Sequence, residues 1–243
     1  MKAIILAAGQ GKRLHSEQFQ LPKVLRRANG LPLVRHVLNA IDFIPAEDTV
    51  LVVGFMAEKV EEELGGAFRY ALQAERRGTG HAVLCAKEAL DGYTGTVLVT
   101  CGDMPLLKKE TYLSLLSLHQ KERNACTVLA CENPDNFGYG RIIRDDAGRF
   151  AAIVEQKDCT GAQAAVTELN MGVYCFEAGA LFDALNKVGN DNAQKEYYLT
   201  DVPRILAGER QAVGVLTIRD VSQGLGVNTE DDLKNVEKVL KER

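Results

Sequence analysis

Short, continuous apolar runs alternate with amphipathic stretches along the first half of the chain. The strand-like runs are AIILA (3–7), TVLVVG (49–54), FRYALQ (68–73) and TVLVTCGD (96–103), and the helix-like stretches lie at 32–41, 57–64 and 78–90. An apolar run without polar alternation is typical of a strand that is buried on both faces, and helices between such strands favour parallel pairing. The sequence therefore predicts an α/β fold with a doubly wound, mostly parallel sheet.

The pattern changes after residue 125. The segments GRIIRDD and GRFAAIVEQ are separated by Asp146-Ala147-Gly148, which predicts a smaller antiparallel hairpin inserted into the fold. Further elements are expected as a strand at 125–133, a strand and helix at 170–185, a loop entering a helix at 196–206, a strand at 212–218 and a helix at 229–243 capped by Thr229. We expect one domain over 1–243, made of halves 1–120 and 121–228 and the closing helix 229–243.

Composition excludes several classes of protein. The net charge is −4 and no basic block is present, so nucleic acid is not expected as a partner. The six cysteines form no CxxC pair, which favours reduced thiols in a cytoplasmic protein over a disulfide framework or a zinc site. No apolar stretch approaches the roughly 20 residues that span a membrane, so no membrane association is expected.

The loop after the first strand has an unusual composition. It reads AAGQGKR, in which Gly9 and Gly11 allow the backbone N–H groups to face a phosphate. Lys12, Arg13 and Lys23 are cations that can neutralise a triphosphate. The spacing matches neither the Walker loop nor the GxGxxG dinucleotide motif. A simple tight turn between strand and helix remains open on this loop alone.

Two other loops carry polar groups suited to binding. Asp103 ends the buried strand in GDMP and can hold Mg2+, a hard cation that prefers oxygen ligands; the alternative is that Asp103 caps the next helix. Gln73 is followed by Gly78-Thr79-Gly80, and its amide can read a base edge with both a donor and an acceptor. The alternative for this segment is an ordinary helix start.

The ordered set of motifs resembles one family. The motifs are LAAGQGKRL, LPK, QAERRGTGHAV, GDMPLL, GYGRI, VEQKD, NMGVY, NAQKEYYLTD and GVNT. Together they resemble the N-terminal domain of the bifunctional bacterial N-acetylglucosamine-1-phosphate uridylyltransferases, over nearly the whole chain. The first three motifs are shared with other sugar-nucleotide pyrophosphorylases and cytidylyltransferases, whereas the later ones point to the amino-sugar branch.

The resemblance implies a Rossmann-like nucleotidyltransferase fold and a role for each matching residue. Residues 1–120 would bind the nucleotide and residues 121–228 the sugar. The implied nucleotide contacts are Leu6, Ala7, Ala8, Gly9, Cys101 and Gly102, with Gln73, Gly78 and Thr79 at the uracil. The implied catalytic groups are Arg13 at the β- and γ-phosphates, Lys23 at the α-phosphate, and Asp103, which with Asn228 would hold Mg2+. The implied sugar pocket consists of Gly140, Glu155, Asn170, Tyr198 and Thr200.

The implied reaction transfers UMP from UTP to N-acetylglucosamine 1-phosphate and releases pyrophosphate. A phosphate monoester is already an anionic nucleophile, so positioning and charge neutralisation matter more than a general base. Alternatives are the same chemistry with another sugar 1-phosphate or with CTP, and a catalytically silent regulatory subunit that binds nucleotide. The silent subunit would be expected to lack Lys23, Asp103 or Asn228, and all three are present.

Several positions depart from the family pattern. Lys12 replaces a threonine, Cys101 stands where an aromatic residue is frequent, and Lys195 replaces a glycine. The segment HSEQFQ, which begins at His15, is longer than usual and puts the reach of Lys23 in question. The hexapeptide repeats that follow this domain in the bifunctional family do not occur in this sequence. We therefore expect no acetyltransferase activity and a monomer or weak homodimer.

Overall fold

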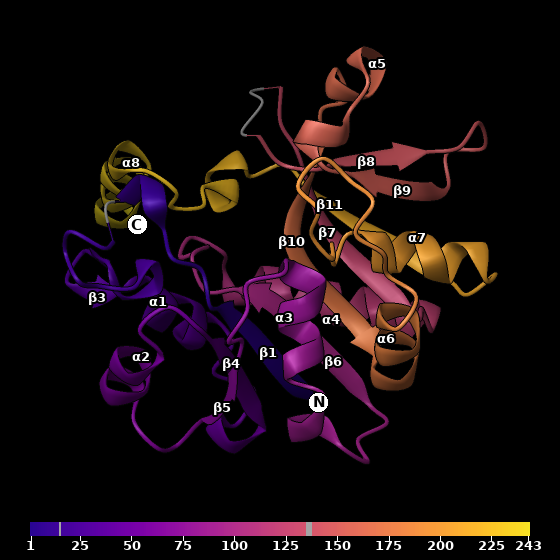
Figure 1. Ribbon diagram of the computed structural model, residues 1–243. Coiled ribbons are helices and arrows are strands. Elements are labelled where there is room, and N and C mark those ends of the chain that lie inside the picture. The colour runs from indigo at the N-terminus through magenta and orange to yellow at the C-terminus, as the bar shows by residue number, and fades with distance from the viewer. Residues whose placement is uncertain (15, 135–137) are drawn as a thin grey trace.

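A central sheet dominates the computed structural model, which describes residues 1–14, 16–134 and 138–243 (Figure 1). Among these residues the sheet has nine strands. They are β1 (Lys2–Ala7), β4 (Thr49–Val53), β5 (Arg69–Leu72), β6 (Thr96–Cys101), β7 (Cys126–Glu132), β8 (Arg141–Arg144), β9 (Phe150–Val154), β10 (Glu168–Glu177) and β11 (Val213–Ile218). The order across the sheet is β11-β7-β10-β6-β1-β4-β5, and β8 joins β9 to β10.

Most of this sheet is parallel, as the sequence predicts. Strands β6, β1, β4 and β5 pair in parallel, and so do β7 and β11. The β8–β9 hairpin is antiparallel and contacts β10 through the pair Leu169–Arg141, which confirms the predicted insertion. The central strand β10 is also antiparallel to both neighbours, β6 and β7. Its direction was not predicted, because an apolar run signals burial and carries no information on orientation.

Helices cover both faces of the sheet. They are α1 (Leu33–Ala40), α2 (Ala57–Leu64), α3 (Thr79–Cys85), α4 (Lys109–Glu122), α5 (Gly161–Ala164), α6 (Ala178–Leu185), α7 (Asp201–Gly208) and α8 (Glu230–Glu242). Residues of α1, α2 and α4 share one buried apolar cluster, and residues of α3, α6 and α7 share another on the opposite face. Neighbours along β1 divide between these clusters, since Ile4 belongs to one and Ile5 to the other. Burial on both faces explains why the strands read as continuous apolar runs.

Helix α8 closes the chain against a third apolar cluster. Leu233 and Val236 of α8 are buried with Leu14, Leu33 and Val227. Thr229 caps the helix, because its side chain accepts from the N–H of Asp232 and the carboxylate of Asp232 accepts from the N–H of Thr229. This confirms the predicted cap. In Figure 1, α8 lies beside the small antiparallel pair formed by β2 (Arg27–Ala28) and β3 (Leu31–Pro32).

Several elements differ from the sequence prediction, and α4, α5 and the β2–β3 pair were not predicted. The helix expected at 78–90 ends at Cys85 and is followed by a separate 3-10 turn, Glu88–Leu90. Helix α4 was not predicted, because its apolar residues do not define a strong stripe.

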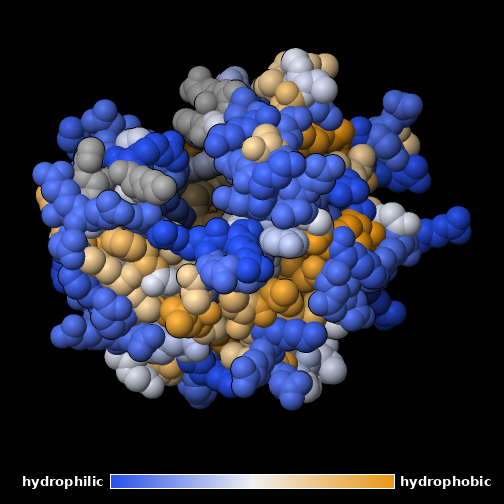
Figure 2. All heavy atoms as spheres, viewed as in Figure 1, coloured by the Kyte–Doolittle hydropathy of each residue, from blue (hydrophilic) through white to orange (hydrophobic). Residues whose placement is uncertain are grey.

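No helix in the described part of the chain is long and apolar enough to cross a membrane. Figure 2 shows hydrophilic residues over most of the visible face, with apolar residues in smaller areas, mainly in its lower half.

Candidate active site

Two adjoining cavities lie at the carboxyl ends of the parallel strands. The first, called here the Gln73 cavity, has a volume of about 260 Å3 and is lined by Leu6, Ala8, Gly9, Gln73, Arg76, Gly78, Thr79, Ala82, Cys101, Asp103 and Glu196. The second, called the Asn170 cavity, has about 220 Å3, and its lining includes Tyr139, Gly140, Glu155, Asn170, Gly172, Thr200, Gly226 and Asn228. Leu6, Thr79, Cys101 and Asp103 line both cavities. A ligand that spans the two would lie along these four residues, of which Asp103 is the only charged one.

Asp103, Lys23 and Asn228 form a polar cluster at this boundary. The Lys23 ammonium forms a salt bridge with Asp103 Oδ2 and donates a hydrogen bond of 2.8 Å to Asn228 Oδ1. All three come from separate parts of the chain, so the cluster depends on the complete fold. The long segment before Lys23 does not prevent its side chain from reaching the site. His15, in that segment, lies outside the described residues.

Local backbone contacts fix Asp103. The N–H of Gly102 donates to the carbonyl of Leu6 at 2.9 Å, and the N–H of Val227 donates to the carbonyl of Asp103 at 3.0 Å. Helix α4 begins only at Lys109, so the alternative in which Asp103 caps the next helix is wrong. The buried strand β6 thus ends in a carboxylate that is held in the cavity wall by contacts on both sides.

The Gln73 cavity is closed by a turn that requires glycine. Gly78 has φ +108°, and a Cβ at this position would lie 2.6 Å from the carbonyl oxygen of Tyr197. Gln73 is buried, and its Nε2 donates to the carbonyl of Gly78 at 3.0 Å and lies 3.1 Å from His81 Nδ1. Thr79 Oγ1 accepts from the N–H of Leu199 at 3.0 Å. These bonds fix the wall and leave the carbonyl oxygen of the Gln73 amide for a ligand.

The loop after β1 passes close to Lys23. Gly11 has φ +69°, and a Cβ here would lie 2.7 Å from Lys23 Cβ and 2.8 Å from Ser16 Oγ, so only glycine fits. Gly9 has open space around its Cα and lines the Gln73 cavity. Arg13 is exposed and lines neither cavity, and among the described residues it has no hydrogen-bond or ion-pair partner.

Glu155 is the main carboxylate of the Asn170 cavity. Its Oε1 accepts a 3.0 Å hydrogen bond from Thr200 Oγ1. Burial raises the pKa of Glu155, the hydrogen bond from Thr200 opposes that shift, and nearby Asp158 and Asp201 add to it. A partly desolvated acceptor of this kind is suited to hydroxyl or amide donors, because it has lost competing water.

A β-bulge places Asn170 in the cavity. The register between β10 and β7 shifts between Asn170 and Tyr174, and Gly172 within the shift has φ +66°. Asn170 Nδ2 donates to the Tyr174 hydroxyl at 2.8 Å, and its Oδ1 accepts from the N–H of Gly172 at 3.2 Å. Bulges re-aim side chains near the ends of pairing. Gly140 lies beside this residue, since its carbonyl accepts from the N–H of Asn170 at 2.8 Å.

Sequence reasoning did not single out Tyr139 or Gly226. The Tyr139 hydroxyl donates to the carbonyl of Gly224 at 2.9 Å and accepts from the N–H of Gly226 at 3.0 Å. A Cβ on Gly226 would lie 2.8 Å from this hydroxyl. Both residues lie inside the quoted motifs GYGRI and GVNT, so the motifs were found but these positions within them were not.

Besides Arg13 and Lys23, three predicted residues line neither cavity. Ala7 is buried in the apolar cluster below the loop, and Gly102 is packed against the carbonyl of Leu6. The side chain of Tyr198 lies in a separate hollow of about 330 Å3, where its hydroxyl donates to Asp158 Oδ2 at 3.2 Å. Glu155 lines this hollow as well as the Asn170 cavity, so Tyr198 is a neighbour of the site across that residue.

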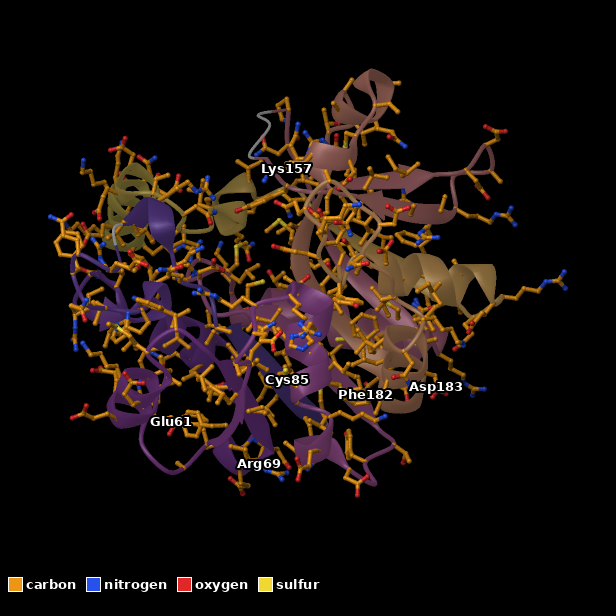
Figure 3. All side chains as sticks on the ribbon, viewed as in Figure 1. Glu61, Arg69, Cys85, Lys157, Phe182 and Asp183 are labelled. Carbon is orange, nitrogen blue, oxygen red and sulfur yellow. The ribbon has the colours of Figure 1, made fainter. Side chains whose placement is uncertain are left out.

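Two of the unusual positions have a structural explanation. Lys195 has φ +57°, a left-handed conformation that glycine adopts at lower cost, and it is exposed with an ion pair to Asp191. Lys157, labelled in Figure 3, contacts the residue before Lys195, since its ammonium donates to Gln194 Oε1 at 2.7 Å. Cys101 Sγ faces the carbonyl of Gly172, and burial raises the pKa of this thiol to about 12, which makes it a poor nucleophile.

Comparison with known proteins identifies the class. The family model for the MobA-like NTP transferase domain matches residues 3–199, and the chain belongs to this family. The fold agrees, since the match spans the parallel strands β4, β5 and β6, nearly all of β1, the β10 bulge and most of both cavities.

Several curated relatives, which all carry one name, match nearly the whole length of this chain. A protein named bifunctional protein GlmU from Halalkalibacterium halodurans is 45% identical over 241 residues, and that from Pelobacter propionicus is 46% identical over 243 residues. The GlmU protein of Streptococcus equi subsp. zooepidemicus is 44% identical over 241 residues. Each comparison covers 99% of this chain and 52% of the relative, so the chain spans about half the length of these relatives.

Proposed function

We propose that this chain transfers UMP from UTP to N-acetylglucosamine 1-phosphate, forming UDP-N-acetylglucosamine and pyrophosphate. The observation that carries the proposal is the boundary between the two cavities, where Asp103 faces both and lies against Lys23 and Asn228. A nucleotide in one cavity and a sugar phosphate in the other would bring their phosphates together at this cluster. The similarity to the GlmU proteins supports the choice of substrates.

The Gln73 cavity has the groups needed for a uracil nucleotide. Gln73 and the turn at Gly78 and Thr79 offer an amide and backbone groups to the base edge. Gly9 lines this cavity with open space around its Cα, and Arg13 follows four residues later in the same loop. We assign the triphosphate to this loop, with Arg13 at its β- and γ-phosphates, because an exposed guanidinium can pair with two phosphate oxygens.

The Asn170 cavity suits an amino sugar. Glu155 accepts hydrogen bonds, Asn170 can donate and accept, and Thr200 holds Glu155 in place. Hydroxyl groups and an acetamido group need this mixture of acceptors and donors. Glu155 is largely buried, which raises its pKa, and a desolvated acceptor of this kind would form stronger hydrogen bonds to a sugar.

The side-chain oxygen atoms at the boundary between the two cavities are suitable ligands for a magnesium ion. One position, now taken by the Lys23 ammonium, is within hydrogen-bond distance of both Asp103 Oδ2 and Asn228 Oδ1. Mg2+ is commonly held by one or two protein oxygens together with phosphate oxygens and water. When bound by Asp103 and Asn228, it would supply positive charge that offsets repulsion between the two phosphate groups.

The chain's own groups would then orient the reactants. Lys23 would move from Asp103 to the α-phosphate and neutralise charge that develops there. Glu155 and Asn170 would hold the sugar so that its phosphate oxygen attacks in line with the departing pyrophosphate. The sugar phosphate oxygen would form the new bond to the α-phosphorus of UTP. The bond between that phosphorus and the oxygen that bridges it to the β-phosphorus would break, so pyrophosphate leaves and no side chain needs to accept a proton.

Pyrophosphate release tests the proposal directly. The assay would combine the sugar 1-phosphates of N-acetylglucosamine, glucose and galactose with UTP, CTP, dTTP and ATP, with Mg2+ or with EDTA. We expect metal-dependent release with UTP and N-acetylglucosamine 1-phosphate. Turnover with another pair would overturn the substrates and keep the chemistry, and UTP binding without turnover in any pair would favour a silent nucleotide-binding subunit.

The proposal also includes a monomer or weak homodimer that acts in the cytoplasm on these small molecules. Both cavities are formed by residues of one chain, which is what a catalytically complete monomer requires. Light scattering on the purified chain tests the state of assembly, and a stable trimer would contradict it.

A further inference from the structure

Arg141 is a fully buried arginine that lies next to the Asn170 cavity without lining it. Its Nη1 donates to the carbonyl of Tyr139, and its Nη2 donates to Gln156 Oε1 and to the carbonyl of Ala164 at 3.5 Å. All three acceptors are uncharged. Its Nε is buried and has no hydrogen-bond partner among the residues that the structure describes.

Other arginines on the same hairpin have charged partners. Arg144 binds both carboxylate oxygens of Glu168, at 2.8 and 2.7 Å, and Arg149 pairs with Asp145. In the described part of the chain, no carboxylate pairs with Arg141. Burying an unpaired guanidinium is costly, so a purely structural role would be filled more favourably by an apolar side chain.

The acceptors of Arg141 belong to three segments, two of which contribute residues to the cavity wall. Tyr139 is followed by Gly140, whose carbonyl accepts from the N–H of Asn170, and both Tyr139 and Gly140 line the cavity. Gln156 directly follows Glu155, the main carboxylate of the cavity. Arg141 pairs with Val154 across the hairpin, so these two segments are adjacent, and the guanidinium hydrogen-bonds to both. A planar fork with several donors can hold both in fixed positions, which a single-point donor cannot.

We propose that Arg141 is a positioning residue for the sugar 1-phosphate: its guanidinium holds the Tyr139–Gly140 segment and the segment that carries Glu155 in fixed positions in the wall of the Asn170 cavity. The inference rests on the proposed function, in which the Asn170 cavity holds the sugar. It assigns Arg141 no contact with substrate. Its effect should therefore be confined to sugar recognition, because the Gln73 cavity has no residue in contact with the guanidinium.

Arg141→Met and Arg144→Met form a matched pair, because both remove an arginine from β8. We expect Arg141→Met to raise KM for the sugar 1-phosphate about ten- to a hundredfold, as for loss of charged hydrogen bonds, with kcat much less affected. The Kd of UTP, measured by calorimetry, should stay within about twofold. Arg144→Met should lower the melting temperature and leave KM for the sugar 1-phosphate unchanged.

Two further variants cover the case in which Arg141→Met does not fold. Arg141→Lys keeps the charge but loses the fork, and should still raise KM. Gln156→Leu removes one acceptor, and should raise KM by a smaller factor. The double variant Arg141→Met/Gln156→Leu should be no worse than Arg141→Met, because the two residues act through one contact.

The inference is overturned by a folded Arg141 variant with the wild-type KM, by an equal loss of UTP affinity, or by an equal rise of KM in Arg144→Met. Failure of the proposed function can be distinguished from failure of this inference, because it would appear as absent or altered turnover in the wild-type protein itself. If the wild type uses another sugar 1-phosphate, the same comparison is made with that substrate. If it turns over none, calorimetric binding of N-acetylglucosamine 1-phosphate to the wild type and Arg141→Lys decides the inference, and equal affinities or no binding would reject it.

Discussion

The Gln73 and Asn170 cavities share a wall, yet they are built in different ways. The Gln73 cavity is formed chiefly by loops that follow β1, β5 and β6, strands that lie in the parallel part of the sheet. The Asn170 cavity uses a bulge in the antiparallel strand β10, one end of the β8–β9 hairpin, and loops from the last quarter of the chain. The first cavity depends on backbone turns, and the second depends on buried side chains held by long-range contacts.

This difference predicts how each cavity responds to change. In the Gln73 cavity the decisive features are the glycine conformations and one amide, so steric substitutions should matter most. In the Asn170 cavity a desolvated carboxylate is decisive, so charge and pH should matter most. Asp103 belongs to both, and its loss should affect the reaction rather than either binding step alone.

Asp103→Asn should have the largest effect. It removes the charge that would anchor Mg2+, and we expect kcat to fall by about a hundred- to a thousandfold, as for loss of one group that stabilises developing charge. UTP should still bind, since the base contacts are unchanged. Steady-state kinetics and calorimetry measure both quantities, with Asp42→Asn, an exposed residue paired with Lys109, as the control. Wild-type kcat in Asp103→Asn would contradict the shared-wall assignment.

Glu155→Gln should have the next largest effect, and only on the sugar side. Removing the charged acceptor is expected to raise KM for the sugar 1-phosphate about tenfold or more while the Kd of UTP is unchanged. Because the pKa of Glu155 is raised in the folded state, the wild-type KM should also increase as pH falls through that pKa. The KM of Glu155→Gln should still vary with pH where the substrate phosphate titrates. It should not show the additional increase that protonation of Glu155 causes in the wild type.

The same substitution should increase stability. A carboxyl with a raised folded-state pKa binds its proton more tightly in the folded protein, so the ionised group lowers the free energy of unfolding at neutral pH and this penalty disappears on acidification. Glu155→Gln is therefore expected to raise the melting temperature at pH 7 and to change it little at pH 4. A lower melting temperature at pH 7 would show that Glu155 stabilises the fold.

Gly78→Ala compared with Gly9→Ala tests the steric nature of the Gln73 cavity. At Gly78 the left-handed φ and the contact with Tyr197 should destabilise the protein by about 1–3 kcal/mol and reduce UTP affinity. At Gly9 a Cβ meets no protein atom within 4 Å, so the melting temperature should be unchanged and UTP affinity alone should fall. Thermal melts and UTP titrations of both variants make the comparison, and equal melting temperatures would contradict it.

His119 of helix α4 provides the smallest effect. It is buried between Thr127 and Glu177, and burial lowers its pKa. The unfolded chain would therefore take up a proton near pH 6.5 before the folded chain does, so the free energy of unfolding should fall as pH drops below about 6.5. Denaturant unfolding at pH 7.5 and 5.5 should show this loss, and His119→Gln should reduce the difference between the two pH values.

The sequence predicted the parallel part of the fold and the Gln73 cavity well. Apolar runs defined β1, β4 and β6, and Asp103 was expected at the end of β6 because a carboxylate followed a buried run. The antiparallel direction of β10 and the bulge at Asn170 were not predictable, because burial patterns are the same for either orientation and a register shift has no local signal. Tyr198 was assigned to the sugar pocket by motif, and the fold turns its side chain into the neighbouring hollow.

The proposed role of Arg141 also could not be predicted from the sequence. Its position in GYGRI gave no reason to separate it from other hairpin arginines, since Arg144 and Arg149 carry the same side chain. Only the three-dimensional arrangement shows that Arg141 is buried and that it hydrogen-bonds to two segments that line the Asn170 cavity. Residues that act through others are found from contacts, whereas residues at strand ends can be found from spacing.

A structure of the chain with UDP-N-acetylglucosamine and Mg2+ bound tests the central claim most directly, because this product would occupy both cavities at once. We expect the uracil against Gln73, the amino sugar against Glu155 and Asn170, and the diphosphate beside Asp103, with Lys23 moved away from that carboxylate. A sugar lying in the hollow beside Tyr198, or a diphosphate that does not approach Asp103, would contradict it.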